Sequence, residues 1–550
     1  MADGTEIIPR DDPVDEKYRV YASISFALLL LGIGIPLWWH TTAVLRVALP
    51  YSGIADLSNR DIKILCKITI ASISKSHAEL LAEEISRKFE NCELHKIYII
   101  KKVISSGLTN SAFTLHDHET IARDFNVGEG ELLLLEAPNL GEVLVGTNRS
   151  VFFPSETSGL KLAQIMSQWL LKDKSLAVTR NALTDPTKYR LDDENRRRFP
   201  ASPTYDVLLT VINPEPEKLN VNWDLPAIVE DYLELFLDHV AAVANFSVKS
   251  QWLYLMPLDV RPRQVPDSSH LGRHYALSED VLPQLITPLE KKIASQVSLH
   301  PCINLVIYMV PCETAPLRIY TREGHRMRSL HNLEGFLSPR WGAVVISNPE
   351  SEICAALNEN ELVKFNVSPA TIMGAFLTQL RRLLGIPDPD DIILGAQVIP
   401  LVDSKPRQWE LDALLRVRAI EQLTSAKLTL QSLAQLLEEI SNIVITDTVA
   451  NRIKSVLELV QRSAEKLERG QLTEGFLLSK KAFITAEAAF TDPSLLALLY
   501  FPEDQKYAVY IPLFLPVMIP VLLSLKKIKR YYFPGSFWRT GINFFSNVFH

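Results

Sequence analysis

The segment Ala22–Trp39 reads ASISFALLLLGIGIPLWW, which is 18 residues without a charge. At about 1.5 Å of rise per residue, a helix of this length just crosses a bilayer core of about 30 Å. Trp38 and Trp39 stand where the aromatic belt of a membrane helix is expected. A cleaved signal peptide is the competing interpretation, but the apolar run is longer than a typical signal core and no clear small-residue cleavage site follows it. We therefore predict a retained membrane helix over residues 22–40.

A second apolar segment, Ala508–Leu525, reads AVYIPLFLPVMIPVLLSL and is followed at once by four basic residues in five positions. Its prolines, Pro512, Pro516 and Pro520, recur every four residues and therefore share one face of a helix. Each proline frees a backbone carbonyl, which is costly in lipid unless another group satisfies it. The segment predicts a membrane helix over residues 507–525, either kinked on its own or with its proline face packed against partner helices.

Basic residues flank the two segments unevenly. Three precede the first segment, whereas Arg46 is the only one that follows it closely. Four follow the second segment, whereas Lys506 is the only one close before it. Because Lys and Arg concentrate in cytosolic loops, residues 1–21 and the basic, aromatic tail 526–550 are predicted to be cytosolic. Residues 41–506 are then predicted to lie on the other side of the membrane.

Three Asn-X-Ser triplets, the acceptor pattern for N-glycosylation, fall in this middle portion at Asn148, Asn245 and Asn366. A chain of this length contains several such triplets by chance, so they support the predicted orientation only mildly. We predict that all three asparagines are N-glycosylated.

The composition excludes several classes of protein. A chain of 550 residues exceeds what one hydrophobic core usually organises. A hydrophobic content of 47% excludes a disordered chain, and a mean hydropathy of +0.08 fits a globular protein with few membrane spans. The net charge of −7 implies no broad basic surface, so no nucleic-acid partner is predicted. The five cysteines are too few for a disulfide scaffold and match no metal-site spacing.

Between about residues 61 and 400, short β-branched or aliphatic runs alternate with amphipathic helical stretches. Strands are expected at Ile62–Ile70, Glu131–Leu135, Asp206–Ile212, Ile303–Tyr308 and Ala343–Ile346. Helices are expected at His77–Phe89, Leu160–Leu171, Pro226–Ala244 and Ala370–Leu384. This alternation predicts a layered α/β domain over residues 41–404.

From Trp409 onward the pattern changes to a helical period, with leucines recurring every seven residues. Asp447 is the expected N-cap of a second helix, and Gly470 is expected to end it. A third helix is expected over Leu472–Phe490. The pattern predicts a helical bundle over residues 405–506.

The search for chemistry finds no Walker A loop, no GxSxG elbow and no HExxH helix. His116 and His118 would share one face of an extended segment, but without a third ligand a solvated loop is the better interpretation. The charges of Glu410–Asp412 and Arg416–Arg418 are interpreted as a charged helix face rather than a site. A cysteine–histidine nucleophile pair stays open because its partners can be far apart in sequence. No catalytic residue, cofactor site or metal site is therefore predicted.

Several segments together resemble the phosphatidylinositol-glycan class S family, a subunit of the GPI transamidase. The resemblance rests on Pro36–Thr42, Leu49–Ile54, Asn213–Pro216, Asn222–Asp224, Ala244–Gln251, Ser338–Gly342, Gln379–Ile386, Trp409–Ile445 and Asp492–Pro516. Residues 60–200 resemble the family only loosely. The tail after Arg530 departs from the family pattern, so the resemblance implies nothing about the tail.

The resemblance implies a non-catalytic, membrane-anchored scaffold subunit in the endoplasmic reticulum. The complex joins a preassembled GPI lipid to the new carboxyl end of a precursor, and its nucleophilic cysteine would belong to a separate caspase-like subunit. The implied partners are that subunit, the class T and class U subunits, the anchor-attachment subunit and membrane lipid. Asn245 matches a glycosylated position of the family. The alternatives are a membrane-anchored luminal hydrolase or glycosyltransferase with dispersed catalytic residues, and a luminal adaptor of another complex.

Overall fold

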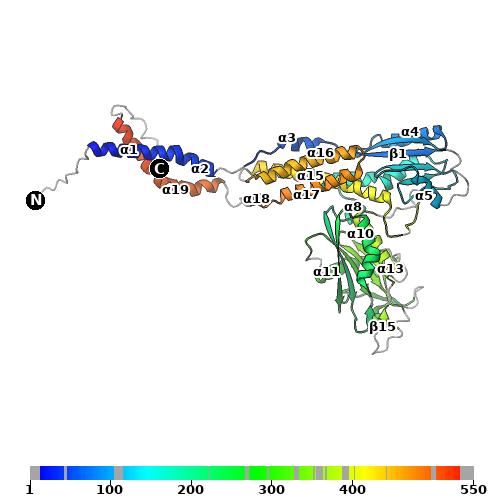
Figure 1. The fold of residues 1–550 in the computed structure, drawn as a ribbon. Coiled ribbons are helices and arrows are strands. Elements are labelled where there is room, and N and C mark those ends of the chain that lie inside the picture. Colours follow the sequence, from blue (N-terminus) through cyan, green and yellow to red (C-terminus); the bar gives the residue numbers. More distant parts are fainter. Residues whose placement is uncertain are drawn as a thin grey trace. The chain divides into compact units, whose positions relative to one another are not determined.

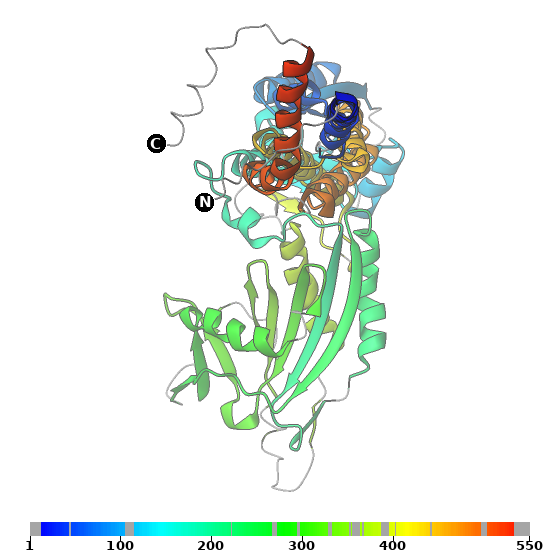
Figure 2. The same cartoon turned by 90° about the vertical axis from the view of Figure 1, so that its left-hand side faces the viewer.

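The computed structural model divides the chain into two compact units (Figures 1 and 2). The smaller unit comprises residues 1–49, 433–452 and 489–550, and the larger comprises residues 50–432 and 453–488. The structure describes residues 13–42, 46–104, 115–221, 223–266, 272–293, 297–327, 333–350, 354, 363–365, 368–386, 395–401, 403–440, 443–496 and 503–532.

The first sheet of the larger unit has six strands in the order β16-β4-β5-β3-β1-β2. These strands are β1 (Ile64–Ser72), β2 (His95–Val103), β3 (Leu132–Glu136), β4 (Val143–Val145), β5 (Ser150–Phe153) and β16 (Ala396–Val398). All neighbours pair in parallel except β4 and β5. Its helices include α4 (Lys75–Phe89), α5 (Leu115–Arg123), α6 (Gly159–Ile165) and α7 (Asp173–Thr184). Every residue of β3 is buried, as expected of a parallel strand covered on both faces.

The second sheet has five strands in the order β13-β14-β11-β6-β8. They are β6 (Thr204–Asn213), β8 (Asn245–Tyr254), β11 (Cys302–Met309), β13 (Leu333–Ser338) and β14 (Gly342–Ser347), and only β13 and β14 pair antiparallel. Two smaller sheets are formed by β9 (Arg263–Val265), β10 (His274–Ser278) and β12 (Leu317–Tyr320), and by β7 (Leu219–Val221) with β15 (Val363–Phe365). The accompanying helices are α8 (Asp193–Arg197), α9 (Leu225–Ile228), α10 (Leu235–His239), α11 (Leu282–Lys292) and α13 (Pro369–Leu384).

The predicted α/β class is confirmed, with two principal sheets. Each of the five expected strands is present with its bounds shifted by at most two residues. The helix expected over Leu160–Leu171 is α6 continued by a π-helical turn over Met166–Leu170. The helix expected to reach Ala244 ends at His239, and after a short turn the edge strand β8 begins at Asn245. The expected strands did not include β8, nor the long strand β2 or the shorter strands of the structure.

The helical region consists of α15 (Gln408–Glu439), α16 (Asp447–Glu468) and α17 (Leu472–Phe490). Leu423, Leu430 and Leu437 are fully buried, so the repeating leucines are core residues. The predicted N-cap Asp447 is wrong by one residue. The Thr446 hydroxyl accepts from the Val449 backbone N–H at 3.4 Å, so Thr446 caps α16 and Asp447 is its first helical residue.

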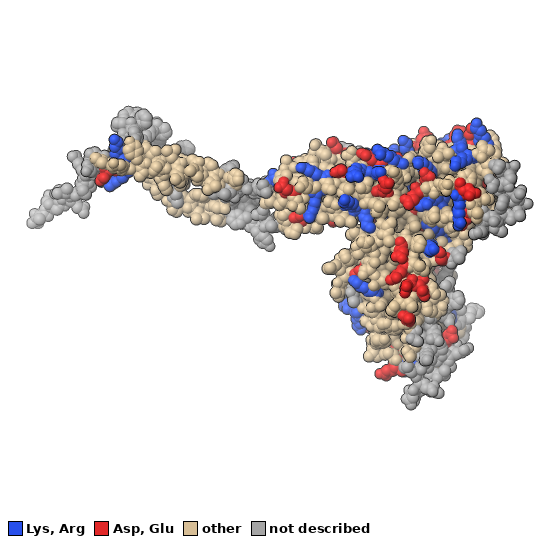
Figure 3. Space-filling model, viewed as in Figure 1, with Lys and Arg blue, Asp and Glu red and all other residues tan. Residues whose placement is uncertain are grey.

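The smaller unit contains α1 (Pro13–Leu29), a π-helical turn (Leu30–Gly34), α2 (Ile35–Thr42), α18 (Pro493–Leu496) and α19 (Glu503–Tyr532). Within it α1 and α19 lie side by side (Figure 1). Among the described residues, the stretch Lys17–Leu37 is long and apolar enough, by length and composition, to cross a membrane. On the face drawn in Figure 3, the paired helices carry a band without charged side chains.

The structure also pairs two cysteines. Cys312 and Cys354 form a disulfide with their Cα atoms 5.4 Å apart, a pairing on which the sequence carried no information. Cys66, Cys92 and Cys302 are free thiols.

Candidate functional site

The first half of α15 carries charged side chains that are almost completely buried. Asp412, Arg416 and Arg418 are each 1% exposed, and Glu410 and Glu421 are 3% and 7% exposed. Removing a charge from water costs several kcal/mol unless a partner of opposite charge and further hydrogen bonds compensate it. The partners of these groups therefore show what this part of the helix holds together.

Asp412 and Arg416 connect α15 to loops of the first sheet. Arg149 binds the Asp412 carboxylate with two nitrogens, at 2.6 Å to Oδ2 and 2.9 Å to Oδ1. The backbone N–H of Gly130 donates to Asp412 Oδ2 at 3.0 Å. Arg416 donates to the carbonyls of Gly130 (2.9 Å) and Leu170 (3.0 Å). The loops before β3 and β5 and the end of the α6 segment are thereby held against one turn of α15.

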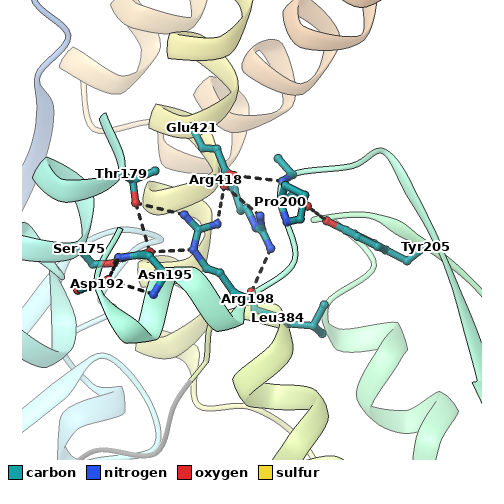
Figure 4. Close-up of polar contacts among 11 residues, drawn as sticks. Ser175, Thr179, Asp192, Asn195, Arg198, Pro200, Tyr205, Leu384, Arg418 and Glu421 are labelled. Atoms are coloured by element: carbon teal, nitrogen blue, oxygen red, sulfur yellow. Dashed lines mark hydrogen bonds and ion pairs between the residues drawn. The ribbon is translucent and has the colours of Figure 1, made fainter. Parts of the chain in front are cut away.

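Glu421 connects α15 to the second sheet (Figure 4). Its Oε2 accepts from Arg198 at 2.7 Å and from Arg418 at 2.9 Å, and its Oε1 accepts from the Ala201 N–H at 3.2 Å. Arg418 also donates to the Leu384 carbonyl, at the end of α13, at 3.2 Å. The segment that leads into β6 and the helix α13 therefore meet the same turn of α15.

Arg198 extends this network toward α7 and α8 (Figure 4). Its Nε donates to Asn195 Oδ1 at 2.8 Å, and its Nη2 donates to the Thr179 hydroxyl at 3.2 Å. The Asn195 amide in turn donates to Asp192 at 2.7 Å and to Ser175 at 2.9 Å. α7 and α8 are thereby tied to α15 through a single guanidinium group.

Glu410 forms a third buried ion pair. Its carboxylate accepts from Arg381 of α13 at 2.9 Å and from Arg407 at 2.8 Å. Arg407 also donates to the Ile399 carbonyl, directly after β16, at 2.8 Å. Glu410 is therefore bound directly to α13 and is linked to the end of β16 only through Arg407.

The electrostatics of Glu421 favour its ionised form. Burial by itself would raise the pKa of the Glu421 carboxyl, but the guanidinium groups of Arg198 and Arg418 and the hydrogen bonds they donate outweigh it and lower that pKa. Glu421 is thus ionised throughout the neutral range. An arrangement in which every carboxylate is neutralised by arginine is suited to holding segments in place rather than to transferring protons.

These contacts correct the interpretation of the α15 charges. Residues 410–418 do form a charged face of a helix, as predicted, but that face is buried instead of facing solvent. The face can be buried because the tertiary structure brings arginines from distant segments against the α15 carboxylates. These arginines are Arg149, Arg198 and Arg381.

The prediction of a solvated loop at His116 and His118 is also wrong, because both residues lie in α5. Positions two apart in a helix point in different directions and do not form a ligand pair. The His118 ring is buried and packs edge-on against Phe152, with ring centroids 5.5 Å apart.

Asn148 and Asn245 belong to the larger unit, and the three prolines belong to the smaller one. Asn245 is exposed at the start of β8, and Asn148 is half-buried between β4 and β5, whereas Asn366 lies outside the described residues. The prolines of the second apolar segment are exposed along α19, which continues as a helix through all three of them: Pro512, Pro516 and Pro520.

None of the free thiols has the lowered pKa that marks a nucleophilic cysteine. Burial raises the pKa of the Cys66 thiol and of the Cys302 thiol to about 11 each. Burial, together with the Asp173 carboxylate, also raises the pKa of Cys92. Catalysis through a thiolate is disfavoured at all three positions.

The structure brings together one cluster that sequence reasoning missed. Cys92, His95 and Asp173 place a sulfur, a ring nitrogen and a carboxylate oxygen within 4.8 Å of one another. The Cys-x-x-His spacing at 92–95 is a local signal that could have been found, but Asp173 stands 78 residues beyond His95 (173 − 95).

Comparison with known proteins agrees with the resemblance noted from the residues. A family model described as "Phosphatidylinositol-glycan biosynthesis class S protein" matches residues 25–534. The rat protein named "GPI-anchor transamidase component PIGS" is 35% identical over 544 residues, covering 92% of this chain and 94% of the relative. The human protein of the same name is 34% identical over 546 residues, with the same coverage.

A more distant relative is similar over the same length. The Schizosaccharomyces pombe protein named "GPI transamidase component PIG-S homolog" is 23% identical over 529 residues, covering 94% of this chain and 85% of the relative. The similarity therefore extends over both apolar segments, both sheets and the helical region. The chain belongs to the phosphatidylinositol-glycan biosynthesis class S family.

Proposed function

We propose that this protein is a membrane-anchored, non-catalytic scaffold subunit of the GPI transamidase, the complex that attaches preassembled GPI lipids to the carboxyl ends of precursor proteins. The relatives named as transamidase components support the assignment to the complex. We further propose the endoplasmic-reticulum membrane as its location. Its partners would be the caspase-like, class T, class U and anchor-attachment subunits.

The observation that carries the scaffold role is the set of buried ion pairs on α15. Asp412 binds Arg149 of the first sheet, and Glu421 binds Arg198 in the segment that leads to the second sheet. Glu410 binds Arg381 of α13 directly and is linked to the end of β16 through Arg407. Rigid positioning of surfaces lowers the entropy that a multi-subunit assembly must lose. The raised thiol pKa values support placing the catalytic nucleophile in another subunit.

Contacts inside the smaller unit support anchorage at both apolar segments. Just after the first segment, the Val47 N–H donates to the Ile445 carbonyl at 3.1 Å. Just before α18, Asp492 accepts from Arg452 of α16 at 2.6 Å. In this proposal residues 22–40 and 507–525 cross the membrane and the termini are cytosolic, so residues 41–506 are luminal. The Cys312–Cys354 disulfide is in keeping with an oxidising lumen.

The function is tested by purifying the tagged full-length chain in mild detergent. We expect the four other transamidase subunits to co-purify. We also expect the isolated chain to give no turnover of precursor peptide with GPI until the caspase-like subunit is added. Recovery without any transamidase subunit would contradict the assignment, and turnover by the isolated chain would favour the luminal hydrolase or glycosyltransferase.

The same co-purification tests the proline face of α19. If that face packs against partner helices, changing Pro512, Pro516 and Pro520 together to leucine reduces subunit recovery while the luminal fold is unchanged. Phe514→Leu with Met518→Leu is the matched control, since these residues lie on the other side of the helix. If both variants co-purified the other subunits equally well, the prolines would kink an isolated span and would not pack against partner helices.

The proposed orientation predicts a glycan on Asn245, the most exposed described sequon asparagine. Asn245→Gln is expected to remove one glycosidase-sensitive step in gel mobility, because only luminal asparagines meet the transferase. Asn148→Gln, at the half-buried sequon, serves for comparison. The proposed orientation would be overturned if the chain showed no glycosidase-sensitive shift and if protease added outside intact microsomes digested its middle portion.

A further inference from the structure

Three potential metal ligands meet at one end of the first sheet. Cys92 lies in the loop after α4, His95 is the first residue of β2, and Asp173 is the first residue of α7. The Cys92 sulfur is 3.8 Å from Asp173 Oδ1, and His95 Nδ1 contacts the same oxygen. Three different elements of the fold therefore direct their donor atoms to one point.

His95 is the unusual member of this cluster. Its side chain is completely buried, and no group among the residues that the structure describes hydrogen-bonds to its Nε2, while its Nδ1 is in close contact with Asp173 Oδ1. A buried polar group without a partner costs about 1–3 kcal/mol. A metal ion bound to the ring would supply the missing partner.

We propose that Cys92, His95 and Asp173 bind a divalent metal ion of the zinc class. Thiolate, imidazole and carboxylate are the donor types that such an ion takes in proteins. Binding releases the proton of the Cys92 thiol, and the resulting thiolate and the Asp173 carboxylate balance the two positive charges of the ion.

Access and surroundings are compatible with an ion. Cys92 is half-buried and the Asp173 side chain is 17% exposed, so an ion can enter from solvent while His95 closes the inner side. Arg416 is a nearby buried cation, but it donates to the carbonyls of Gly130 and Leu170 rather than to the cluster. With three protein ligands, the fourth position is left to water.

The site would stabilise the protein rather than react with a substrate. It would join the loop after α4, the start of β2 and the start of α7, which the sheet ladder alone does not connect. The inference is independent of the transamidase proposal, since it concerns metal content and stability only. The competing explanation is a buried His95–Asp173 ion pair without any metal.

Metal titration of the purified full-length chain distinguishes the two explanations. After removal of metals with a chelator, we expect one equivalent of Zn²⁺ to bind and to raise the unfolding temperature. Co²⁺ in the same position is expected to show a thiolate-to-cobalt charge-transfer band. Cys92→Ser should abolish the band and weaken Zn²⁺ binding by at least about 10-fold.

Cys302→Ser is the matched control, because Cys302 is another half-buried free thiol, on β11. It should retain the band, the stoichiometry and the Zn²⁺-dependent stabilisation. If His95→Gln does not fold, Asp173→Asn tests the same site from its more exposed side. Equal Zn²⁺ binding by wild type and Cys92→Ser, or a band lost only in Cys302→Ser, would overturn the proposal in favour of the plain ion pair.

Discussion

Gly342→Ala is expected to disrupt the second sheet and to lower the free energy of unfolding by about 4 kcal/mol or more. Gly342 begins β14 with a φ of +155°, a conformation that residues with side chains rarely adopt. A Cβ atom there would lie 2.0 Å from the backbone oxygen of Asn304, its partner on β11. Because that oxygen is backbone, it can move only if the ladder breaks. Thermal unfolding of the full chain in detergent measures the loss.

Gly374→Ala is the matched control. Gly374 lies inside α13, and a Cβ atom added there meets nothing within 4 Å. The same substitution should therefore stabilise the protein by about 0.4–1 kcal/mol, since alanine restricts the unfolded chain. If Gly342→Ala were as stable as wild type, the close approach of β14 to β11 described above would be wrong.

Glu421→Ala is expected to lower the free energy of unfolding by about 3–5 kcal/mol, because it leaves two buried guanidinium groups without a counter-charge. Arg198 and Arg418 would both lose their carboxylate partner, and the Ala201 N–H would lose its acceptor. Urea unfolding followed by tryptophan fluorescence measures the change. Arg198 also donates hydrogen bonds to Thr179 of α7 and to Asn195. We therefore expect the substitution to destabilise α7, which belongs to the first sheet, together with the second sheet.

Glu83→Ala provides the control for removing a glutamate from an ion pair. Glu83 and Arg87 pair at 2.9 Å on α4, but their side chains are 73% and 70% exposed. Exposed pairs contribute at most about 1 kcal/mol, so this variant should unfold almost like wild type. Similar losses for Glu83→Ala and Glu421→Ala would show that the α15 pair is not desolvated.

The Glu421 contribution also has a predicted pH dependence. Its pKa in the folded protein is lowered from the ordinary value of 4.5, so the stabilisation is complete above pH 4.5. It is lost as the pH falls further and the carboxyl takes up a proton in the folded state. The stability difference between wild type and Glu421→Ala should therefore narrow below pH 4.5, and should not change between pH 6 and 8.

Local patterns in the sequence were sufficient to predict the strands β1, β3, β6, β11 and β14 and the three long helices of the helical region. Runs such as Leu132–Leu135 are buried strands because apolar residues in succession fit a sheet covered on both faces, and α17 spans the predicted Leu472–Phe490. The strand β8 escaped prediction because an edge strand alternates exposed and half-buried residues and lacks a continuous apolar run.

The sequence by itself therefore determined the α/β class, the helical region, the two apolar segments and the family, because hydrophobic periodicity and local motifs are properties of neighbouring residues. Tertiary structure alone decided which charges are buried and which donor atoms meet. Asp412 pairs with Arg149 across 263 positions, and Glu421 pairs with Arg198 across 223. The same order of charged residues along a helix can form a solvent-exposed face or a buried network. The two cases differ only in whether folding brings oppositely charged residues from distant parts of the sequence into contact with the helix and excludes water.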